Sequence, residues 1–356
     1  MPSPTACRYS VSRILPSGTT ATQNAFGIVP NLRTPYTEQW DFTVERQLGG
    51  FAIRLSYVGT HSVDLIYTRN LNQPMPSLIP FNQNRRPYPI FNTVTNYHSC
   101  AEQHSNGLQA IVAKNYGDGL TFNGGWTWAK DLTDAQDTET QFNLNNEWCN
   151  NQITPTHRVF GYLIYQLPFG AGRRYLNNNN RFVNGGLGRW QISWNLMWEW
   201  RQFFTPSFAG FDPSNTNVLG GRPNRVPGVS LYPTNGSAIS QWFNPAAFAI
   251  PGCPLSTPVC TNPVAIGRHG DAGLGIIRGP NISNADLSVP KYSPIYESLR
   301  MEFRANFVNV FNHPNFTLPA ANISAPATVE QITSTTPATF GTVGPRETDF
   351  QVRVEF

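Results

Sequence analysis

The amino-acid sequence predicts an all-β fold, an antiparallel transmembrane β-barrel of which about nine or ten strands are present. Three observations predict it. Several segments alternate apolar and polar side chains with period two, which is typical of strands that have one face in an apolar medium. Short and long connections alternate along the chain, as they do in membrane barrels. Charged residues make up 13% of the 356 residues, about half of the roughly 25% usual in soluble domains.

Nine strands are expected from Tyr36 onward. They cover residues 36–48, 51–59, 106–115, 120–128, 156–167, 189–203, 282–291, 298–311 and 350–356. The clearest alternation lies in 189–203 and 298–311. We expect their apolar side to face lipid, through Trp190, Ile192, Trp194, Leu196, Trp198, Trp200, Leu299, Met301 and Phe303. We expect a lumen-facing side that carries Glu199, Arg201, Arg300, Glu302, Arg304 and, on the last strand, Arg353. These charges suit paired side chains that keep a lumen wet.

The connections predict the orientation. They are short at 49–50, 116–119 and 293–296, medium at 168–188, and long at roughly 60–105, 131–155, 204–281 and 312–347. If the long loops face outward, nine strands place the start of the chain outside, whereas single-chain barrels normally have an even number of strands. Residues 8–15 offer a weak tenth strand. No signal peptide is visible, so we expect an N-terminally truncated chain: a loop or remnant at 1–35 and barrel at 36–356.

The cysteines indicate an oxidising compartment. Cys253 and Cys260 enclose a short proline-rich segment that suits a loop disulfide, and Cys100 and Cys149 could pair if their loops meet, with free thiols as the alternative for each pair. No cysteines have the C-x-x-C spacing of a zinc or redox site.

No cofactor, metal set or catalytic constellation emerges from residue spacing, so an enzyme is not expected. Five histidines, His98, His104, His157, His269 and His313, are expected in or near loops without metal-ligand spacing. Asp134, Asp137 and Glu139 could bind Ca²⁺, but a solvated acidic loop is the preferred interpretation. The net charge of +4 is small and scattered, which argues against nucleic-acid binding.

The last strand carries a further signal. Phe350, Val352, Val354 and the terminal Phe356 form an apolar row that can add to the edge of a partner's sheet. We interpret this row as the recognition signal for the barrel-assembly machinery.

The sequence resembles Oar-like TonB-dependent receptors over about residues 30–356. The matching segments follow the family's order: TPYTEQWDFTVERQLGGFAIRLSYVGTHS from Thr34, NLNQP (70–74), SNGLQAIVAKNYGDGLTFNGGWTWAKDLTD from Ser105, YQLPFGAGRRY from Tyr165, GRWQISWNL from Gly188, GRPNRVPG (221–228), WFNPAAFAIP (242–251), IIRGPNISNADLSVPKY (276–292), FRANFVNVFNHPNF (303–316) and the terminal FGTVGPRETDFQVRVEF.

The resemblance implies a 22-stranded outer-membrane barrel preceded by a plug and an N-terminal carboxypeptidase-regulatory-like domain. Uptake of a solute would be powered by the TonB complex through the plug. No plug or TonB box is recognised in this sequence, so we expect the C-terminal portion of a barrel in the bacterial outer membrane, in contact with its lipid. The outer loops would contact a solute that the sequence does not identify, and the large loop 204–281 is the candidate for this contact or for capping the pore. A structural or adhesive outer-membrane barrel is the alternative, and a secreted all-β binding module is a third.

Overall fold

The computed structural model of the chain describes residues 23–117, 119–135, 139–142, 147–177, 181–200, 202–296, 299–336 and 344–356. It contains one short helix, α1 (Arg181–Leu187), and two 3₁₀ turns, η1 (Gln83–Arg85) and η3 (Pro245–Ala247). The long strands are β2 (Tyr36–Leu48), β3 (Phe51–Asn70), β4 (Phe91–Gly117), β5 (Leu120–Thr133), β7 (His157–Gln166), β8 (Gln191–Glu199), β15 (Ile282–Tyr296), β16 (Leu299–Val308) and β17 (Glu347–Glu355). The short strands are β1 (Gln23–Ile28), β6 (Cys149–Asn150), β9 (Phe203–Phe204), β10 (Phe208–Ala209), β11 (Gly220–Gly221), β12 (Asn224–Arg225), β13 (Phe248–Ala249) and β14 (Ile277–Arg278).

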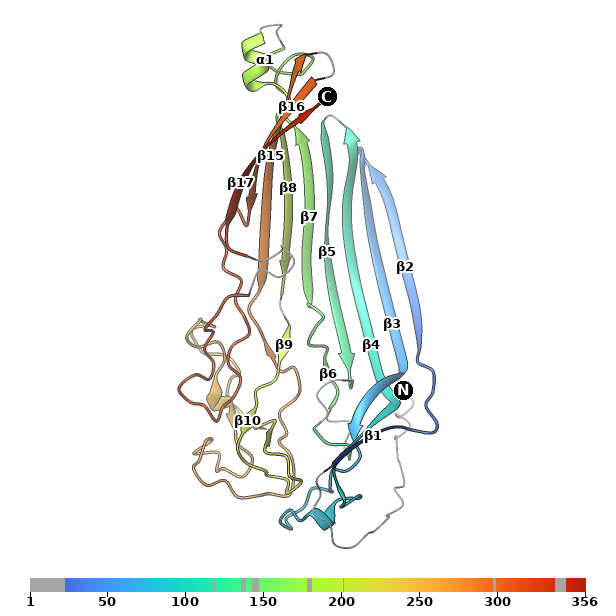
Figure 1. Cartoon of the computed structure of the whole chain (residues 1–356), viewed down its shortest axis with the longest axis vertical. Helices are drawn as coiled ribbons and strands as arrows, with labels where there is room; N and C mark the ends of the chain where they lie inside the picture. Colours follow the sequence, from blue (N-terminus) through green and yellow to red (C-terminus); the bar gives the residue numbers. More distant parts are fainter. Residues whose placement is uncertain are drawn as a thin grey trace.

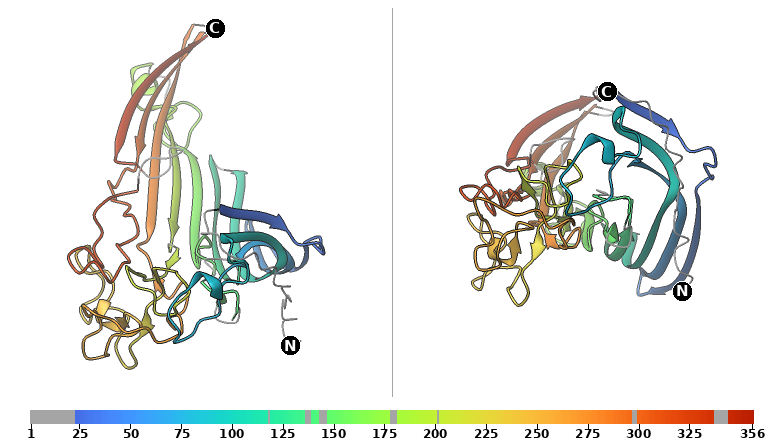
Figure 2. Two further views of the ribbon diagram at one scale, coloured as in Figure 1. Left: turned by 60° about the horizontal axis from the view of Figure 1, so that its bottom comes forward. Right: turned by 90° about the horizontal axis from the view of Figure 1, so that it is seen from below.

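All nine predicted strands are confirmed, and they pair in one sheet. Its order is β17-β16-β15-β8-β7-β5-β4-β3-β2, with antiparallel pairing between each neighbour (Figure 1). Seen along the strands, the sheet curves through an open arc (Figure 2). Strands β2 and β17 form its two edges, so the barrel is not closed by the described residues. Among these residues, no helix combines the length and apolar character that a membrane crossing requires.

The tight turns lie at one end of the sheet, as the connection lengths predict. At the β2–β3 turn, Gly49 and Gly50 have φ angles of 55° and 86°. Two successive positive φ values are the requirement of the type I′ hairpin, which glycine meets without strain. This turn sets the register in which Leu48 pairs with Phe51 and every later pair of the hairpin follows.

The registers divide the sheet into an apolar face and a polar face. One row of paired residues on the apolar face crosses seven strands: Val44, Leu55, Ala110, Trp126, Val159, Trp198 and Ser283. The adjacent row on the polar face is Thr43, Ser56, Gln109, Thr127, Arg158 and Glu199. Because side chains alternate along every strand, the two chemistries stay separated across the sheet.

Charged side chains on the apolar face are confined to its ends. Arg46, Lys114 and Lys291 lie near the tight turns, whereas Glu38 and Lys130 lie toward the long loops. Lys291 donates from Nζ to the carbonyl oxygens of Gly185 and Gly186 and lies 4.8 Å from the ring centroid of Trp190. A lysine whose stem covers apolar surface while its ammonium reaches polar groups at the rim is typical of a membrane interface. Between these ends the described part of the apolar face carries no charged side chain, which suits contact with lipid.

One predicted connection is wrong in its extent. The connection expected at 60–105 is mostly strand, because β3 has 20 residues and β4 has 27. At about 3.4 Å per residue, β4 extends far beyond an apolar band of about 25 Å, and its outer half has no period-two contrast to reveal it. The segment 1–35, expected as a loop or an N-terminal remnant, contains β1, which pairs in parallel with β4. The weak tenth strand, 8–15, lies outside the described residues.

The long connections fold into a loop assembly of their own at the other end of the sheet (Figures 1 and 2). We use this name for residues 71–90, 134–156, 202–281 and 309–336 where they are described. Part of the assembly has a hydrophobic core of buried residues from 204–277 and 323–329, which includes Phe204, Phe208, Phe243, Phe248, Ile250, Ile277, Ile323 and Val329. The segment 204–281 was expected as a long connection. It is instead organised by two-residue strand pairs around this core.

The two candidate disulfides differ in outcome. Cys253 and Cys260 are bonded to each other in the loop assembly. Cys100 and Cys149 are not joined to each other, and Cys149 donates from Sγ to the carbonyl oxygen of Thr133 at 3.4 Å. Strand β5 lies between β6, which contains Cys149, and β4, which contains Cys100. Two strand spacings of about 4.8 Å exceed the roughly 7 Å that a disulfide can bridge between Cα atoms.

Candidate functional site

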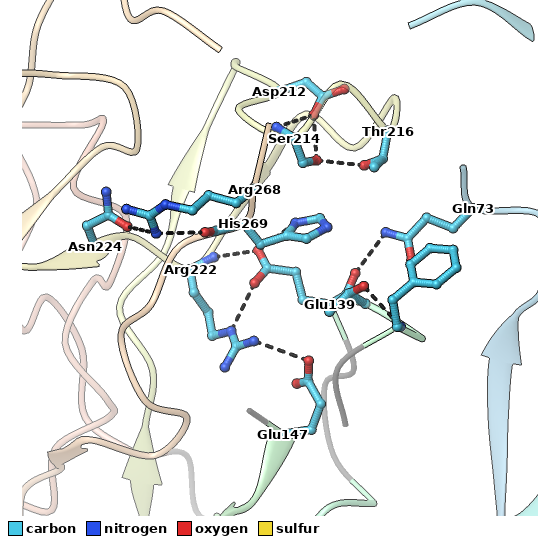
Figure 3. Close-up of polar contacts among 12 residues, drawn as sticks. Gln73, Glu139, Glu147, Asp212, Ser214, Thr216, Arg222, Asn224, Arg268 and His269 are labelled. Carbon is cyan, nitrogen blue, oxygen red and sulfur yellow. Dashed lines mark hydrogen bonds and ion pairs between the residues drawn. The ribbon is translucent and has the colours of Figure 1, made fainter. Parts of the chain in front are cut away.

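A buried cluster of charged side chains joins two segments of the loop assembly, 134–156 and 202–281 (Figure 3). At its centre is Arg222, which follows β11. Its Nε donates to Oε2 of Glu139 at 2.9 Å, and its Nη2 donates to Oε1 of Glu147 at 3.2 Å. The side chain of Glu147 has no exposed surface, and those of Arg222 and Glu139 are each 7% exposed. His269 completes the cluster, with Nδ1 at 3.8 Å from Oε1 of Glu139.

The local backbone explains how the carboxylate of Glu139 reaches the chain at Arg222. Its Oε1 accepts a hydrogen bond from the backbone N–H of Arg222 at 2.9 Å. The preceding residue, Gly221, has a φ of 138°, and a β-carbon there would collide with this carboxylate. Glycine therefore serves both the backbone conformation and the close approach. The result is a bidentate contact in which one carboxylate binds a guanidinium and an amide together.

Burial shifts the protonation of two members of the cluster. Desolvation raises the pKa of Glu147 to about 7, although the nearby Arg222 opposes the shift and Glu139 adds to it. Desolvation also lowers the pKa of His269, against the opposite pull of Glu139 and Asp212. Glu147 Oε2 and His269 Nε2 are buried and have no hydrogen-bond partner among the described residues. The cluster therefore changes its charge close to neutral pH.

Opposite pH dependences are expected for the two groups. The pKa of Glu147 is raised from 4.5 to about 7, so the folded loop assembly binds more protons than the unfolded one, and stability falls as pH rises through this window. The pKa of His269 is lowered from 6.5, so its contribution makes stability rise with pH up to about 6.5. In the His269→Asn variant, the protection of the loop amides from hydrogen exchange should therefore decrease as pH rises from 4.5 to 7, after correction for the intrinsic exchange rate. In Glu147→Gln, protection should instead increase with pH up to about 6.5. Equal profiles in both variants would show that the cluster does not control the assembly.

A cavity of about 500 Å³ lies beside the cluster in the loop assembly, within the size range of small-molecule sites. Gln73 connects the two: its Nε2 donates to the carbonyl oxygen of Glu139 at 2.9 Å. The cavity is lined by Gln73, Met75, Pro76, Ser77, Asn84, Arg85, Arg86, Pro87 and Phe142.

The two arginines of the cavity are held in place by backbone. Arg85 donates to the carbonyl oxygens of Met75, Ile79 and Asn215, and Arg86 donates to that of Asn72. The guanidinium group of Arg85 is therefore largely saturated, whereas Arg86 donates, among the described residues, only to Gln83 and Asn72. We infer that the cavity suits a ligand with apolar surface and a few polar groups rather than a highly charged anion.

The structure places the residues expected to face lipid on the apolar face. Trp194 pairs with Leu163 and Leu287, and Phe303 pairs with Lys291 and Val352. The remaining members fall on the same face by alternation along β8 and β16, and Trp190 and Trp200 flank β8 at its two ends. The assembly-signal residues Phe350, Val352 and Val354 continue this face on the edge strand β17, and Phe356 is the last residue.

The described residues among those expected to face the lumen lie on the polar face, where most of them contact a residue of opposite charge. Arg304 donates from Nε to Glu302 at 2.9 Å, Arg353 lies 3.2 Å from Glu355, and Glu199 lies 3.9 Å from Arg158. Arg300 pairs with Glu355 across β16 and β17. Arg201 lies outside the described residues.

The cluster around Arg222 was not predicted from the sequence. Asp134 and Glu139 were interpreted as a solvated acidic loop, and this is wrong: both are buried, while Asp137 lies outside the described residues. The partners come from two separate connections, and nothing in local spacing joins them. The one available signal was the Gly221–Arg222 pair, where a glycine that permits close approach precedes a cation.

Comparison with known proteins places the chain among membrane barrels. A family model described as "Outer membrane beta barrel domain" matches residues 2–348. No curated protein matches the chain. Among solved structures, the chain is similar to BauA, the ferric preacinetobactin receptor from Acinetobacter baumannii, at 13% identity and a TM-score of 0.42, over 89% of this chain and 29% of that one.

Two further solved structures are similar to the same degree. The FrpB iron transporter from Neisseria meningitidis has 13% identity and a TM-score of 0.42, over 92% of this chain and 32% of that one. The pyoverdine outer membrane receptor FpvA from Pseudomonas aeruginosa has 11% identity and a TM-score of 0.41, over 90% of this chain and 30% of that one. The chain thus spans about three tenths of the length of these proteins.

Proposed function

The chain belongs to the outer membrane beta barrel domain family, and from this premise we propose that it forms the C-terminal part of the barrel of an Oar-like TonB-dependent receptor. The protein is located in the bacterial outer membrane. Its proposed role is to bind a solute in the loop assembly and to pass it through the lumen. The ordered series of matching segments from Thr34 to Phe356 supports the assignment to the Oar-like group.

One observation carries the proposal. The nine strands pair in registers that place their apolar side chains on one face of the sheet. The loops at one end of the sheet fold around a cavity and a buried charge cluster. The apolar face suits lipid, and the polar face suits an aqueous lumen. A folded loop assembly with a cavity suits the binding of a ligand. A simple pore would not require such a cavity.

The proposed partners follow from the same arrangement. Edge strand β17 exposes Phe350 and Val352, which supports recognition of this strand by the barrel-assembly machinery. Contact with the TonB complex would occur through a plug domain of the whole receptor. The proposed solute is a ligand with apolar surface and a few polar groups, because this is the kind of ligand that suits the cavity.

An adhesive outer-membrane barrel is the second candidate function, and one observation favours it. Several large apolar side chains of the loop assembly are more than half exposed, among them Met75, Leu78, Ile79, Ile153, Leu219 and Val264. Exposed apolar surface of this kind suits a protein partner.

An uptake experiment separates the two functions. The gene that contains this chain is deleted from its bacterium, and depletion of solutes from the medium is compared with the parent and with a strain that lacks TonB. We expect one class of solute to remain in the medium in both mutants. Complementation with Phe142→Ala, which alters the cavity lining, should lower its uptake about tenfold, equivalent to about 1.4 kcal/mol of binding. The control Ile153→Ala, at an exposed loop position, should restore full uptake. Unchanged uptake together with lost attachment to surfaces would contradict transport and favour adhesion.

A further inference from the structure

Two histidines and a glutamate meet on the apolar face at the outer end of the strands. His61 on β3 and His104 on β4 are direct cross-strand partners, and their rings stack with centroids 4.1 Å apart and planes inclined by 13°. Glu102 precedes His104 by two residues, so alternation along β4 directs it to the same face. One ligand atom from each of the three residues lies within 4.8 Å of the others.

A β-bulge lies directly beside this pair. Ser62 pairs with Gln103 and Leu65 with Ala101, so Val63 and Asp64 together oppose the single residue Glu102. Asp64 has a φ of 55°, in the left-handed region. A bulge of this kind bends the strand and redirects nearby side chains. The backbone of Glu102 is anchored from the other side, where its N–H donates to Asp134 at 2.7 Å and its carbonyl oxygen accepts from Thr133 at 2.9 Å.

The separations among these polar atoms leave room for an ion. His104 Nε2 lies 3.8 Å from Glu102 Oε2, and His61 Nδ1 lies 3.7 Å from an oxygen of Glu38 on β2. Both distances are too long for a hydrogen bond. The distance between His104 and Glu102 is close to the spacing of about 3.4 Å that ligand atoms adopt when each lies 2.0–2.1 Å from a tetrahedral zinc ion. His61 Nε2 is buried and has no hydrogen-bond partner among the described residues.

We propose that His61, Glu102 and His104 bind a divalent transition-metal ion of the zinc class. Two imidazole nitrogens and one carboxylate oxygen are the ligand set that borderline cations prefer, whereas Ca²⁺ and Mg²⁺ require mainly oxygen ligands. Water is available for a fourth position. The bound ion would fasten β3 to β4 at the level where both strands leave the apolar band.

The spacing of residues along the chain does not reveal this site, because its ligands come from two strands. His104 was expected in or near a loop, and it lies instead within β4. The pairing register alone brings it beside His61.

Zinc titration of the full chain in detergent micelles, followed by calorimetry, tests the proposal. We expect one zinc ion per chain, and we expect His61→Ala and His104→Ala each to weaken binding about 100-fold or more, since a three-ligand site loses a ligand. The matched control is His313→Ala, whose backbone lies in the turn after β16, and it should bind zinc as the parent does. Zinc binding that is unaffected in the two site variants, or lost equally in the control, would overturn the proposal.

A second measurement separates a lost ligand from a misfolded chain. Zinc should raise the melting temperature of the parent, because an ion that binds only the folded state stabilises it. Glu102→Gln should melt as the parent does without zinc but show a much smaller rise with it. Mg²⁺ at the same concentration should cause no rise. An equal rise with zinc in the parent and in Glu102→Gln, or with Mg²⁺ in place of zinc, would contradict the assigned ligand set.

Discussion

Replacing Arg222 by methionine should destabilise the loop assembly by about 3–5 kcal/mol, because it leaves the buried carboxylates of Glu139 and Glu147 without their counter-charge. The side chain of methionine fills much of the same volume, so the loss is mainly electrostatic. Hydrogen exchange of the loop amides measures the effect, with the amides of β4 and β5 as an internal reference for the sheet.

Arg268→Met provides the control for this change. Arg268 lies in the same connection, but it is 54% exposed and its ion pair with Asp271 spans 3.6 Å. An exposed pair of this kind contributes at most about 1 kcal/mol. Equal loss of protection in Arg222→Met and Arg268→Met would mean that the buried cluster does not hold the assembly together.

Glu147→Gln tests the same cluster by removing an acidic partner instead of the cation. Because burial raises the pKa of Glu147 to about 7, this carboxyl is already partly protonated at neutral pH. Its neutral replacement should therefore cost far less than the loss of Arg222, and above pH 7 it should stabilise the assembly relative to the parent.

Leu196→Arg should cost roughly 2–4 kcal/mol in a phospholipid bilayer, the range measured for a cation on the lipid side near the midplane of a membrane barrel. Leu196 lies in the middle of β8 on the apolar face, between Gly161 and Ala285. The penalty arises because a charge leaves water for hydrocarbon. Chemical unfolding of the chain in bilayers gives the free energy directly.

The neighbouring Asn195→Arg is the matched control. Asn195 lies on the polar face, paired with Tyr162 and Asp286, and the new arginine would be close to a carboxylate. Its effect on the free energy of unfolding should be small. Similar penalties at both positions would contradict the assignment of the two faces.

The strands could be predicted because the membrane imposes a simple rule on them. A strand with lipid on one side and water on the other must alternate, as residues 190–200 do, and this pattern is visible in one segment at a time. The outer halves of β3 and β4 were missed because water or other protein lies on both sides there. Cross-strand hydrogen bonds rather than alternation hold that part of the sheet, and sequence alone does not show them.

The loop assembly and both proposed sites depend on contacts between distant segments. The core that contains Phe204, Phe243 and Ile323 draws on two connections, and Arg222 meets carboxylates from a third. His61 and His104 become neighbours only through strand register. A local sequence pattern predicts a secondary-structure element, whereas the tertiary structure decides which charged residues and which ligands come together.

The central claim is that the face bearing Trp194, Leu196 and Trp198 contacts lipid. Single spin labels introduced at each position from 191 to 199, in the chain reconstituted in bilayers, test it most directly. Collision rates with oxygen, which concentrates in lipid, should peak at 192, 194, 196 and 198. Collision rates with a water-soluble nickel chelate should peak at the positions between them. The reversed phase, or no period of two, would contradict the account.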